Sequence, residues 1–300
     1  MGYHLRAWIR RDLVFPRTAP GSHWLSRESV GSMARTLHHS MVAAEGGEPL
    51  HWLYLLHGIY GSGRNWASIA RRLVEGRPEW QVVLVDLRLH GRSTGFEPPH
   101  TVERSAEDLT NLERSLDHPA DAVLGHSFGG KVALLRAGSG PPLGQVWVAD
   151  STLRTGEPEG SAWELIDIVR GLPDRFLSRD EIADALLEHG YPRGVGQWLA
   201  MNLEREGDAF RWKLDWEGVE ELLIDYFQTE IWGIVEQPPA ETSIHIIKAR
   251  ASNAIDPATV ERIERAGEQS HRVFLHTIDG GHWMNIDNPD AVVELLVEHL

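Results

Sequence analysis

The sequence contains no cysteine among its 300 residues. This absence excludes disulfide bonds, thiolate zinc sites and cysteine nucleophiles together. No run approaches the roughly 20 apolar residues that a membrane-spanning helix needs. Basic residues are also few, because 29 Lys and Arg stand against 44 Asp and Glu and give a formal net charge of −15. A surface of this charge repels phosphate groups, so we expect no nucleic-acid partner and no stable membrane anchor.

Residues 1–33 lack the apolar core and the small-residue cleavage site of a secretory signal peptide. We expect this segment to be a poorly ordered N-terminal extension that the folded domain does not need, with a targeting presequence as the alternative. The composition is that of a globular protein, with 42% hydrophobic and 24% charged residues. We expect a cytoplasmic protein that is a monomer or a homodimer.

Short apolar strands alternate with amphipathic helices in the first half of the chain and again at its end. Strands are predicted at residues 35–43, 52–58, 80–88, 121–127, 145–151, 242–250 and 271–282. Helices are predicted at residues 66–74, 101–117, 129–138, 256–268 and 288–300. This alternation builds right-handed βαβ units, so we predict an α/β core, residues 34–152 and 236–300, with a mostly parallel sheet between two layers of helices.

Residues 153–235 break this alternation and contain no convincing buried strand. Four segments with apolar stripes are predicted to be helices, at residues 161–172, 178–190, 194–206 and 216–235. We therefore predict a helical cap inserted into the core. Most of its tryptophans are expected to pack inside the cap, but Trp163 and Trp198, together with Trp283, are the candidates to line an apolar substrate pocket.

A serine stands between two glycines at the end of one predicted strand, in the sequence Gly125-His126-Ser127-Phe128-Gly129. A serine hydroxyl attacks esters poorly unless a base removes its proton. A tight strand-to-helix corner exposes the hydroxyl for such chemistry, and this corner needs small residues two positions before and two positions after the serine. Ser127 is therefore the candidate nucleophile.

An acyl-transfer site also needs donors for the oxyanion that develops on the substrate carbonyl. One donor is the backbone N–H of Phe128, which follows the nucleophile. The other is expected in the loop His57-Gly58-Ile59-Tyr60-Gly61, after the strand at residues 52–58. We predict the N–H of Ile59, with Tyr60 as the alternative, and we expect His57 to be a structural hydrogen-bonding residue.

The candidate base is His282, because it lies in a glycine-flanked loop, DGGHWMNIDNP, just before the last predicted helix. His126 is adjacent to the serine and is expected to point away from the site in a structural role. His38 and His39 do not form a metal pair, because adjacent residues on a strand face opposite sides. We predict no metal and no cofactor.

The motifs HGIYG, DLRLHGRS, GHSFGG and DGGHW follow one another in this order over residues 34–300. With these motifs the sequence resembles the α/β-hydrolase superfamily. It is most similar to small serine esterases, a group that includes bacterial enzymes cleaving acyl-CoA esters and mitochondrial hydrolase-domain proteins. The resemblance implies the α/β-hydrolase fold, with an eight-stranded, mostly parallel sheet and a helical cap inserted after the sixth strand.

The acid of the catalytic triad is not fixed by the common pattern of the superfamily, which places it after the strand that corresponds to residues 242–250. Residues 251–254 contain no acidic side chain. The esterase group is similar to a variant with the acid after the sixth strand, which implies Asp150. The alternative acid is Asp256, which also has the position of a helix cap.

Together, these residues predict a carboxylesterase that cleaves esters of short to medium acyl chains through a Ser-His-Asp triad and an acyl-enzyme. A thioesterase and a C–C bond hydrolase share this triad and are alternatives. A hydrolase-fold protein that binds a small ligand with slow turnover is a third alternative, because fold does not fix function.

Overall fold

A computed structural model describes residues 35–300. The prediction for residues 1–33 lies outside the described residues. The central sheet has the strand order β1-β3-β2-β4-β5-β9-β10. Its strands are β1 His39–Val42, β2 His51–Leu56, β3 Trp80–Val85, β4 Ala122–His126, β5 Gln145–Ala149, β9 Ser243–Ala249 and β10 Val273–Ile278. Only β1 pairs antiparallel within this described sheet, which confirms the mostly parallel α/β architecture.

The described residues contribute seven strands to this sheet, and not the eight that the family resemblance implied. Residues between the start of the described chain and β2 form only the four-residue β1. An exposed turn at Glu45 and Gly46, where Gly46 has φ +70°, follows β1, and β2 begins at His51. This segment is therefore too short for a second strand beside β1.

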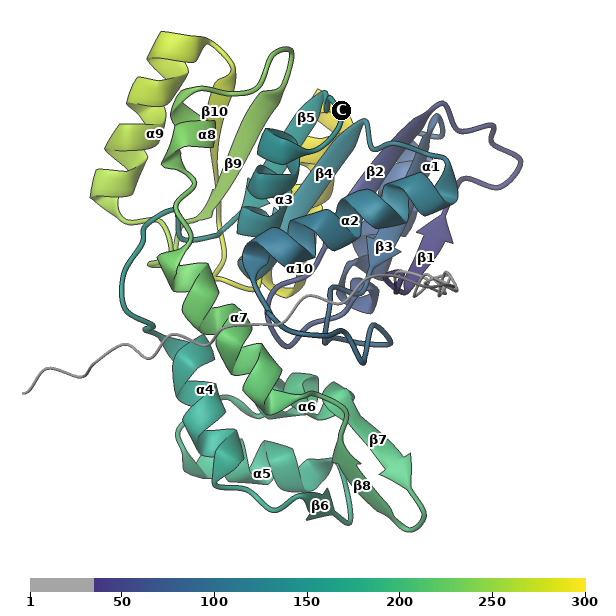
Figure 1. Cartoon of the computed structure of the whole chain (residues 1–300), viewed down its shortest axis with the longest axis vertical. Helices are drawn as coiled ribbons and strands as arrows, with labels where there is room; N and C mark the ends of the chain where they lie inside the picture. The colour runs from purple at the N-terminus through teal and green to yellow at the C-terminus, as the bar shows by residue number, and fades with distance from the viewer. Residues whose placement is uncertain (1–34) are drawn as a thin grey trace, which may run out of the picture. The chain divides into compact units, whose positions relative to one another are not determined.

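Helices cover both faces of the sheet (Figure 1). Along β2, Leu53 and Leu55 pack into the hydrophobic cluster beneath α1 and α11. Tyr54 and Leu56 pack into the cluster beneath α2, α3 and α9. This alternation follows from the period of two along a strand and explains why the strand sequences are apolar throughout. The helices are α1 Ala67–Gly76, α2 Val102–Leu116, α3 Phe128–Ser139, α9 Pro257–Ser270 and α11 Pro289–His299.

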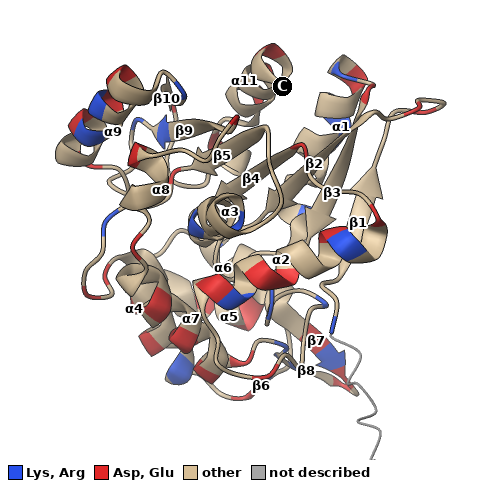
Figure 2. Ribbon diagram, turned by 45° about the horizontal axis from the view of Figure 1, so that its top comes forward, with Lys and Arg blue, Asp and Glu red and all other residues tan. Residues whose placement is uncertain are grey.

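The segment predicted to be a cap lies between β5 and β9 and occupies the lower part of Figure 1, and we keep the name cap for it. Its helices are α4 Ser161–Arg170, α5 Asp180–Glu188, α6 Arg193–Leu199 and α7 Trp216–Gln228, and a short helix, α8 Trp232–Glu236, leads back to the core. Acidic residues colour much of α2, α4 and α7 in Figure 2. No helix of residues 35–300 is both long and apolar enough to cross a membrane.

The sequence predicted a purely helical cap, and this is wrong. The cap also contains a small antiparallel sheet in the order β6-β8-β7. Its strands are β6 Arg175–Phe176, β7 Leu203–Glu206 and β8 Ala209–Trp212. The helix predicted over residues 194–206 ends at Leu199 and is followed by a 3-10 turn, Ala200–Asn202. Residues 203–206 then pair with β8 across a turn in which Gly207 has φ +63°. A left-handed glycine permits this tight hairpin, and the pairing places Arg211 2.8 Å from Glu204.

Candidate active site

Ser127 lies at the corner between β4 and α3, as the sequence predicted, with φ +51° and ψ −117°. The two flanking glycines are required by space. A Cβ on Gly125 would lie 1.9 Å from the carbonyl oxygen of Gly129, and a Cβ on Gly129 would lie 2.7 Å from that of His57. The corner therefore holds Ser127 in a strained conformation at the edge of the sheet, where strain is typical of functional residues.

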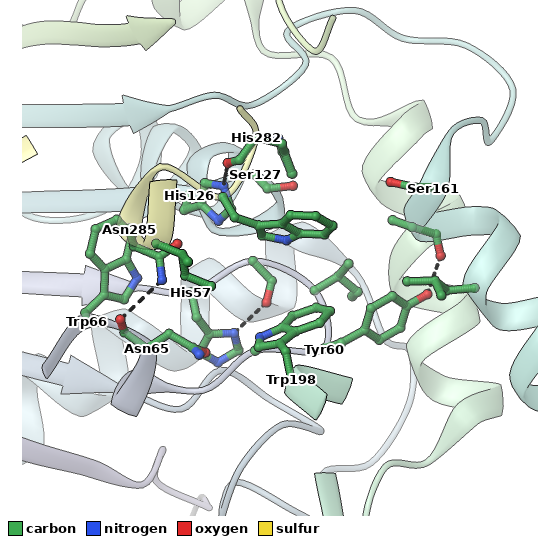
Figure 3. A pocket seen from close by; sticks show the side chains of 17 residues that line it. His57, Tyr60, Asn65, Trp66, His126, Ser127, Ser161, Trp198, His282 and Asn285 are labelled. Carbon is green, nitrogen blue, oxygen red and sulfur yellow. Dashed lines mark hydrogen bonds between the residues drawn. The ribbon is translucent and has the colours of Figure 1, made fainter. Parts of the chain in front are cut away.

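His282 lies in the loop between β10 and α10 Met284–Asp287, and its ring reaches the same cavity as Ser127 (Figure 3). Nδ1 of His282 is 2.8 Å from Oδ2 of Asp150. Asp150 directly follows β5, is fully buried, and accepts the backbone N–H of Ala249 at 3.1 Å. Burial acts to raise the pKa of Asp150, but the hydrogen bonds from His282, Ser252 and Ala249 outweigh it and hold the pKa below its usual value. Asp150 is therefore an ionised carboxylate that can orient the imidazole.

The alternative acid, Asp256, is placed elsewhere. It caps the N-terminus of α9 by accepting the backbone N–H of Thr259 at 2.7 Å, and it forms an ion pair with Arg154 at 3.3 Å. The sequence had indicated this capping position. Within residues 35–300, the carboxylate that contacts the His282 side chain is Asp150.

The predicted oxyanion donors are placed around the nucleophile. The N–H of Phe128 has no intrahelical acceptor because Phe128 is the first residue of α3. Ile59 lines the cavities beside Ser127. The N–H of Tyr60, the alternative donor, is donated to Nε2 of His90 at 3.0 Å, which favours Ile59 as the prediction to be tested.

The loop that carries Ile59 comes very close to the nucleophile. A Cβ on Gly58 would lie 3.1 Å from Nδ1 of His126 and 3.3 Å from Cβ of Ser127. His57 has both ring nitrogens on backbone groups, the carbonyl of Gly58 at 2.7 Å and the N–H of Leu87 at 3.0 Å. These contacts fit the predicted structural role, and burial lowers the pKa of His57.

The sequence predicted that His126 points away from the site, and the structure shows instead that its ring lies within it. Its ring lies 4.7 Å from the ring of His282, and Nε2 donates to the backbone carbonyl of His282 at 2.7 Å. Burial and the neighbouring His282 lower the pKa of His126 to about 3, so it is neutral. The residue before the nucleophile thus fixes the backbone of the candidate base. The direction of its side chain depends on the corner at Ser127 and could not be derived from the motif.

Two cavities meet at Ser127, Ile59 and His282. The first, which we call the aromatic cavity, has a volume of about 50 Å³ and is drawn in Figure 3. The second, the larger cavity, has a volume of about 560 Å³. The aromatic cavity is walled mainly by Trp66, Leu165, Trp198, Trp283 and Ile286. The larger cavity is walled by Phe128, Thr152, Arg154, Leu223, Tyr226 and Phe227, among others.

The structure places Trp198 and Trp283 in the predicted pocket but leaves Trp163 outside both cavities. Ser161, Ala162 and Leu165 of α4 line the aromatic cavity. At 100° per residue, position 163 lies on the far side of the helix from positions 161 and 165. Trp163 instead packs against the larger hydrophobic cluster, which extends from the core into the cap. The helical phase separates Trp163 from Ser161 and Leu165, but only the docking of α4 on the core decides which of these sides faces the cavity.

Sequence reasoning also missed Trp66, Leu165 and Tyr226 as residues that line the cavities. Trp66 lies at the start of α1, and its indole N–H donates to the carbonyl of Leu56 at 3.2 Å. No spacing or motif distinguishes these positions from core positions.

Among residues 35–300, no group of three His, Cys, Asp or Glu side chains is arranged to hold a metal ion.

The model of the alpha/beta hydrolase family matches residues 53–295. The chain is 26% identical to an sn-1-specific diacylglycerol lipase of Mus musculus, over 97% of this chain and 93% of that protein. It is 28% identical to the enzyme of the same description in Danio rerio, over 83% and 78%. A solved structure of a marine microorganism esterase is 27% identical and superposes with a TM-score of 0.76, covering 89% of this chain and 100% of that one.

Proposed function

The chain belongs to the alpha/beta hydrolase family, and from this premise we propose that it is a serine carboxylesterase that cleaves esters of short acyl chains. The observation that carries the proposal is the 2.8 Å contact between His282 and the buried, ionised Asp150, beside Ser127 at its corner. The lipase and esterase descriptions of the relatives support ester cleavage as the reaction.

In the proposed reaction, Nε2 of His282 takes the proton of the Ser127 hydroxyl while Oγ attacks the ester carbonyl. The N–H groups of Ile59 and Phe128 stabilise the oxyanion of the tetrahedral intermediate. His282 then gives its proton to the leaving alkoxide, which departs as the alcohol and leaves an acyl-enzyme. In the second half, His282 takes a proton from water, which attacks the acyl-enzyme, and then returns this proton to Oγ of Ser127 as the acid leaves. Asp150 stabilises the imidazolium in both halves.

The two cavities support a division of the substrate between them. The aromatic cavity is largely apolar and small, because about 50 Å³ holds only a few water-sized groups at ~10–15 Å³ each. We assign it to a short acyl chain. The larger cavity, of about 560 Å³, has polar and charged side chains in its wall and is assigned to the alcohol part of the ester. This favours the short end of the range that the sequence indicated.

The test is hydrolysis of a series of p-nitrophenyl esters, from acetate to palmitate. Ser127→Ala is expected to abolish turnover and keep the fold. Ser139→Ala is the matched control, because this exposed serine lies at the other end of α3 and bonds the carbonyl of Leu135. Activity that peaks at acetate to butyrate and is lost only in Ser127→Ala supports the proposal.

Two other outcomes contradict the proposal. Full activity in pure Ser127→Ala would show that Ser127 is not the nucleophile. A folded wild-type protein without turnover on any ester, but active on acyl thioesters, identifies a thioesterase instead.

A further inference from the structure

Tyr226 is a residue of the cap whose hydroxyl lies at the edge of the core. It belongs to α7 and its side chain is buried. The hydroxyl lies 3.1 Å from Oγ of Ser151 and accepts the backbone N–H of Thr152 at 3.1 Å. These two residues directly follow Asp150. The phenol ring packs on Phe128, with 6.0 Å between ring centroids, and lines the larger cavity together with Ser127.

The two hydrogen-bond contacts of the Tyr226 hydroxyl can both be made with its oxygen as the acceptor, so the acceptor of its own proton is still to be identified. A phenol oxygen donates one hydrogen bond and accepts others. The N–H of Thr152 can only donate, and the Ser151 hydroxyl can also donate, so both can be accepted by the Tyr226 oxygen. The phenolic proton is then available for a group across the larger cavity, which Ser127 lines together with Tyr226.

The hydroxyl stays protonated in the working range of the enzyme. Burial raises the pKa of Tyr226 to about 12, although the hydrogen bonds with Ser151 and Thr152 act to lower it. A neutral phenol is a donor that does not itself take the proton of Ser127. It therefore does not compete with His282 for the role of base.

The position of Tyr226 is fixed by the core and not only by the cap. Nζ of the buried Lys131, on α3, donates to the backbone carbonyls of Tyr226 at 2.7 Å and Thr229 at 2.9 Å. It also donates to the carbonyl of Arg154 at 3.0 Å, and it lies 4.8 Å from the centre of the Tyr226 ring. Lys131 thus ties both connections of the cap to the helix that begins beside Ser127, so the cap helix delivers its hydroxyl to a defined place.

We propose that Tyr226 is a positioning residue that donates a hydrogen bond to Oγ of Ser127 and holds this oxygen in line for attack. The phenolic proton stays on Tyr226, while the Ser127 proton passes to His282. The donor also stabilises the negative charge that develops on Oγ as its proton leaves. This inference rests on the proposed function, and it adds a cap residue to a site otherwise made by the core.

The test compares Tyr226→Phe with wild type, using p-nitrophenyl esters from acetate to octanoate and inactivation by a fluorophosphonate. Phenylalanine keeps the ring against Phe128 and removes one oxygen. We expect kcat to fall about tenfold or more, as for loss of a hydrogen bond to a charged group, with KM within about twofold of wild type. The same factor should appear at every chain length and in the inactivation rate, since each depends on Oγ of Ser127.

The matched control is Tyr191→Phe, which makes the same change elsewhere in the cap, where the hydroxyl bonds Glu164 at 2.8 Å. It should leave kcat and KM unchanged. A purely structural role of Tyr226 would loosen the cap and would change KM and the chain-length profile.

Each remaining outcome decides the question. Unchanged kcat in Tyr226→Phe, or a change in KM alone, overturns the positioning role and leaves the proposed function standing. Wild-type protein that neither cleaves esters nor reacts with the fluorophosphonate overturns both. If Tyr226→Phe does not fold, 3-fluorotyrosine at position 226 keeps the oxygen and makes the hydroxyl a stronger donor. A change in kcat at constant KM then supports the role, and no change overturns it.

Discussion

Asp150 and His282 are 132 residues apart in the sequence, and their side chains meet at 2.8 Å. Asp150 follows β5, and the loop of His282 follows β10 two strands away in the sheet. Because β5, β9 and β10 run parallel, the loops after them emerge at the same edge. Ser127 follows β4, the other neighbour of β5, so three chain segments deliver the triad candidates to one edge of the sheet.

This relationship predicts a large effect of a one-atom change in the acid. Asp150→Asn is expected to lower kcat by about 10³- to 10⁴-fold, because an amide no longer fixes the tautomer of His282 or stabilises its charged form. Asp256→Asn is the matched control and should keep full activity, because its side chain caps α9. Steady-state kinetics on p-nitrophenyl acetate checks both variants. Loss of activity in Asp256→Asn with activity retained in Asp150→Asn would reverse the assignment.

The candidate nucleophile and base could be predicted from local sequence. The corner at Ser127 requires glycine at positions 125 and 129 for lack of space, so the motif by itself indicates the local backbone geometry. His282 was indicated by its place before the last helix. The acid could not be found in this way, because a single aspartate at a strand end and one at a helix start have the same local pattern. Here the family resemblance favoured Asp150, and in the structure Oδ2 of Asp150 lies 2.8 Å from Nδ1 of His282.

The approach of the oxyanion loop predicts that Gly58→Ala loses activity without unfolding. The new Cβ would lie 3.1 Å from Nδ1 of His126 and 3.3 Å from Cβ of Ser127. Relief of these contacts needs a shift of a few tenths of an ångström, and we expect the loop, with the N–H of Ile59, to make it. Loss of one oxyanion donor costs about 10²- to 10³-fold in kcat. Kinetic assays and a thermal melt measure the two effects separately.

Gly156→Ala is the matched control for this change. A Cβ at Gly156 meets no atom within 4 Å, so both kcat and the melting temperature should match wild type. Gly58→Ala with unchanged kcat would show that the Ile59 N–H is not an oxyanion donor.

The shape of the aromatic cavity predicts how acyl-chain preference responds to Trp198→Ala. The Trp198 ring lies 6.0 Å from that of Trp283 and 6.2 Å from that of Tyr60, and its removal lengthens the cavity. Each additional CH₂ that is buried contributes about 0.8 kcal/mol, so room for two more raises kcat/KM for the longer ester about tenfold relative to acetate. Trp163→Ala, the control outside the cavity, should leave this ratio unchanged. Equal ratios in the two variants would refute the assignment of the aromatic cavity to the acyl chain.

The cap was the part of the fold that the sequence predicted least well. The β7–β8 hairpin has exposed, charged strands such as Leu203–Glu206, which follow an amphipathic helix without a break in composition. The small sheet also pairs β8 with β6, about thirty residues earlier, and propensity alone does not predict such a long-range pairing. The side of α4 that faces the site was likewise set by the docking of the cap on the core, so Trp163 could not be excluded in advance.

Three buried histidines predict that the protein loses stability as the pH falls below neutrality. Burial, together with neighbouring histidines, lowers the pKa values of His90, His126 and His245 to about 3 each. Their ordinary value is 6.5. Between these values the unfolded chain binds more protons than the folded one. The stability is therefore fully present above about pH 6.5 and is lost as the pH falls toward 3, by ~1.4 kcal/mol per pH unit for each histidine.

His245 allows this titration to be tested away from the candidate active site. Its ring stacks on Trp147, with 4.1 Å between centroids, and Nδ1 lies 3.0 Å from Nε2 of His276. In His245→Gln the amide can keep a hydrogen bond to His276 but does not titrate. Below about pH 6.5, denaturant unfolding should therefore show a shallower pH slope than in wild type, by up to ~1.4 kcal/mol per pH unit for the one histidine removed. Esterase activity at pH 7.5 should be unchanged. Equal slopes for the two proteins would mean that His245 does not stay neutral in the folded state, and a wild-type stability that is flat over this range would remove the same conclusion for all three.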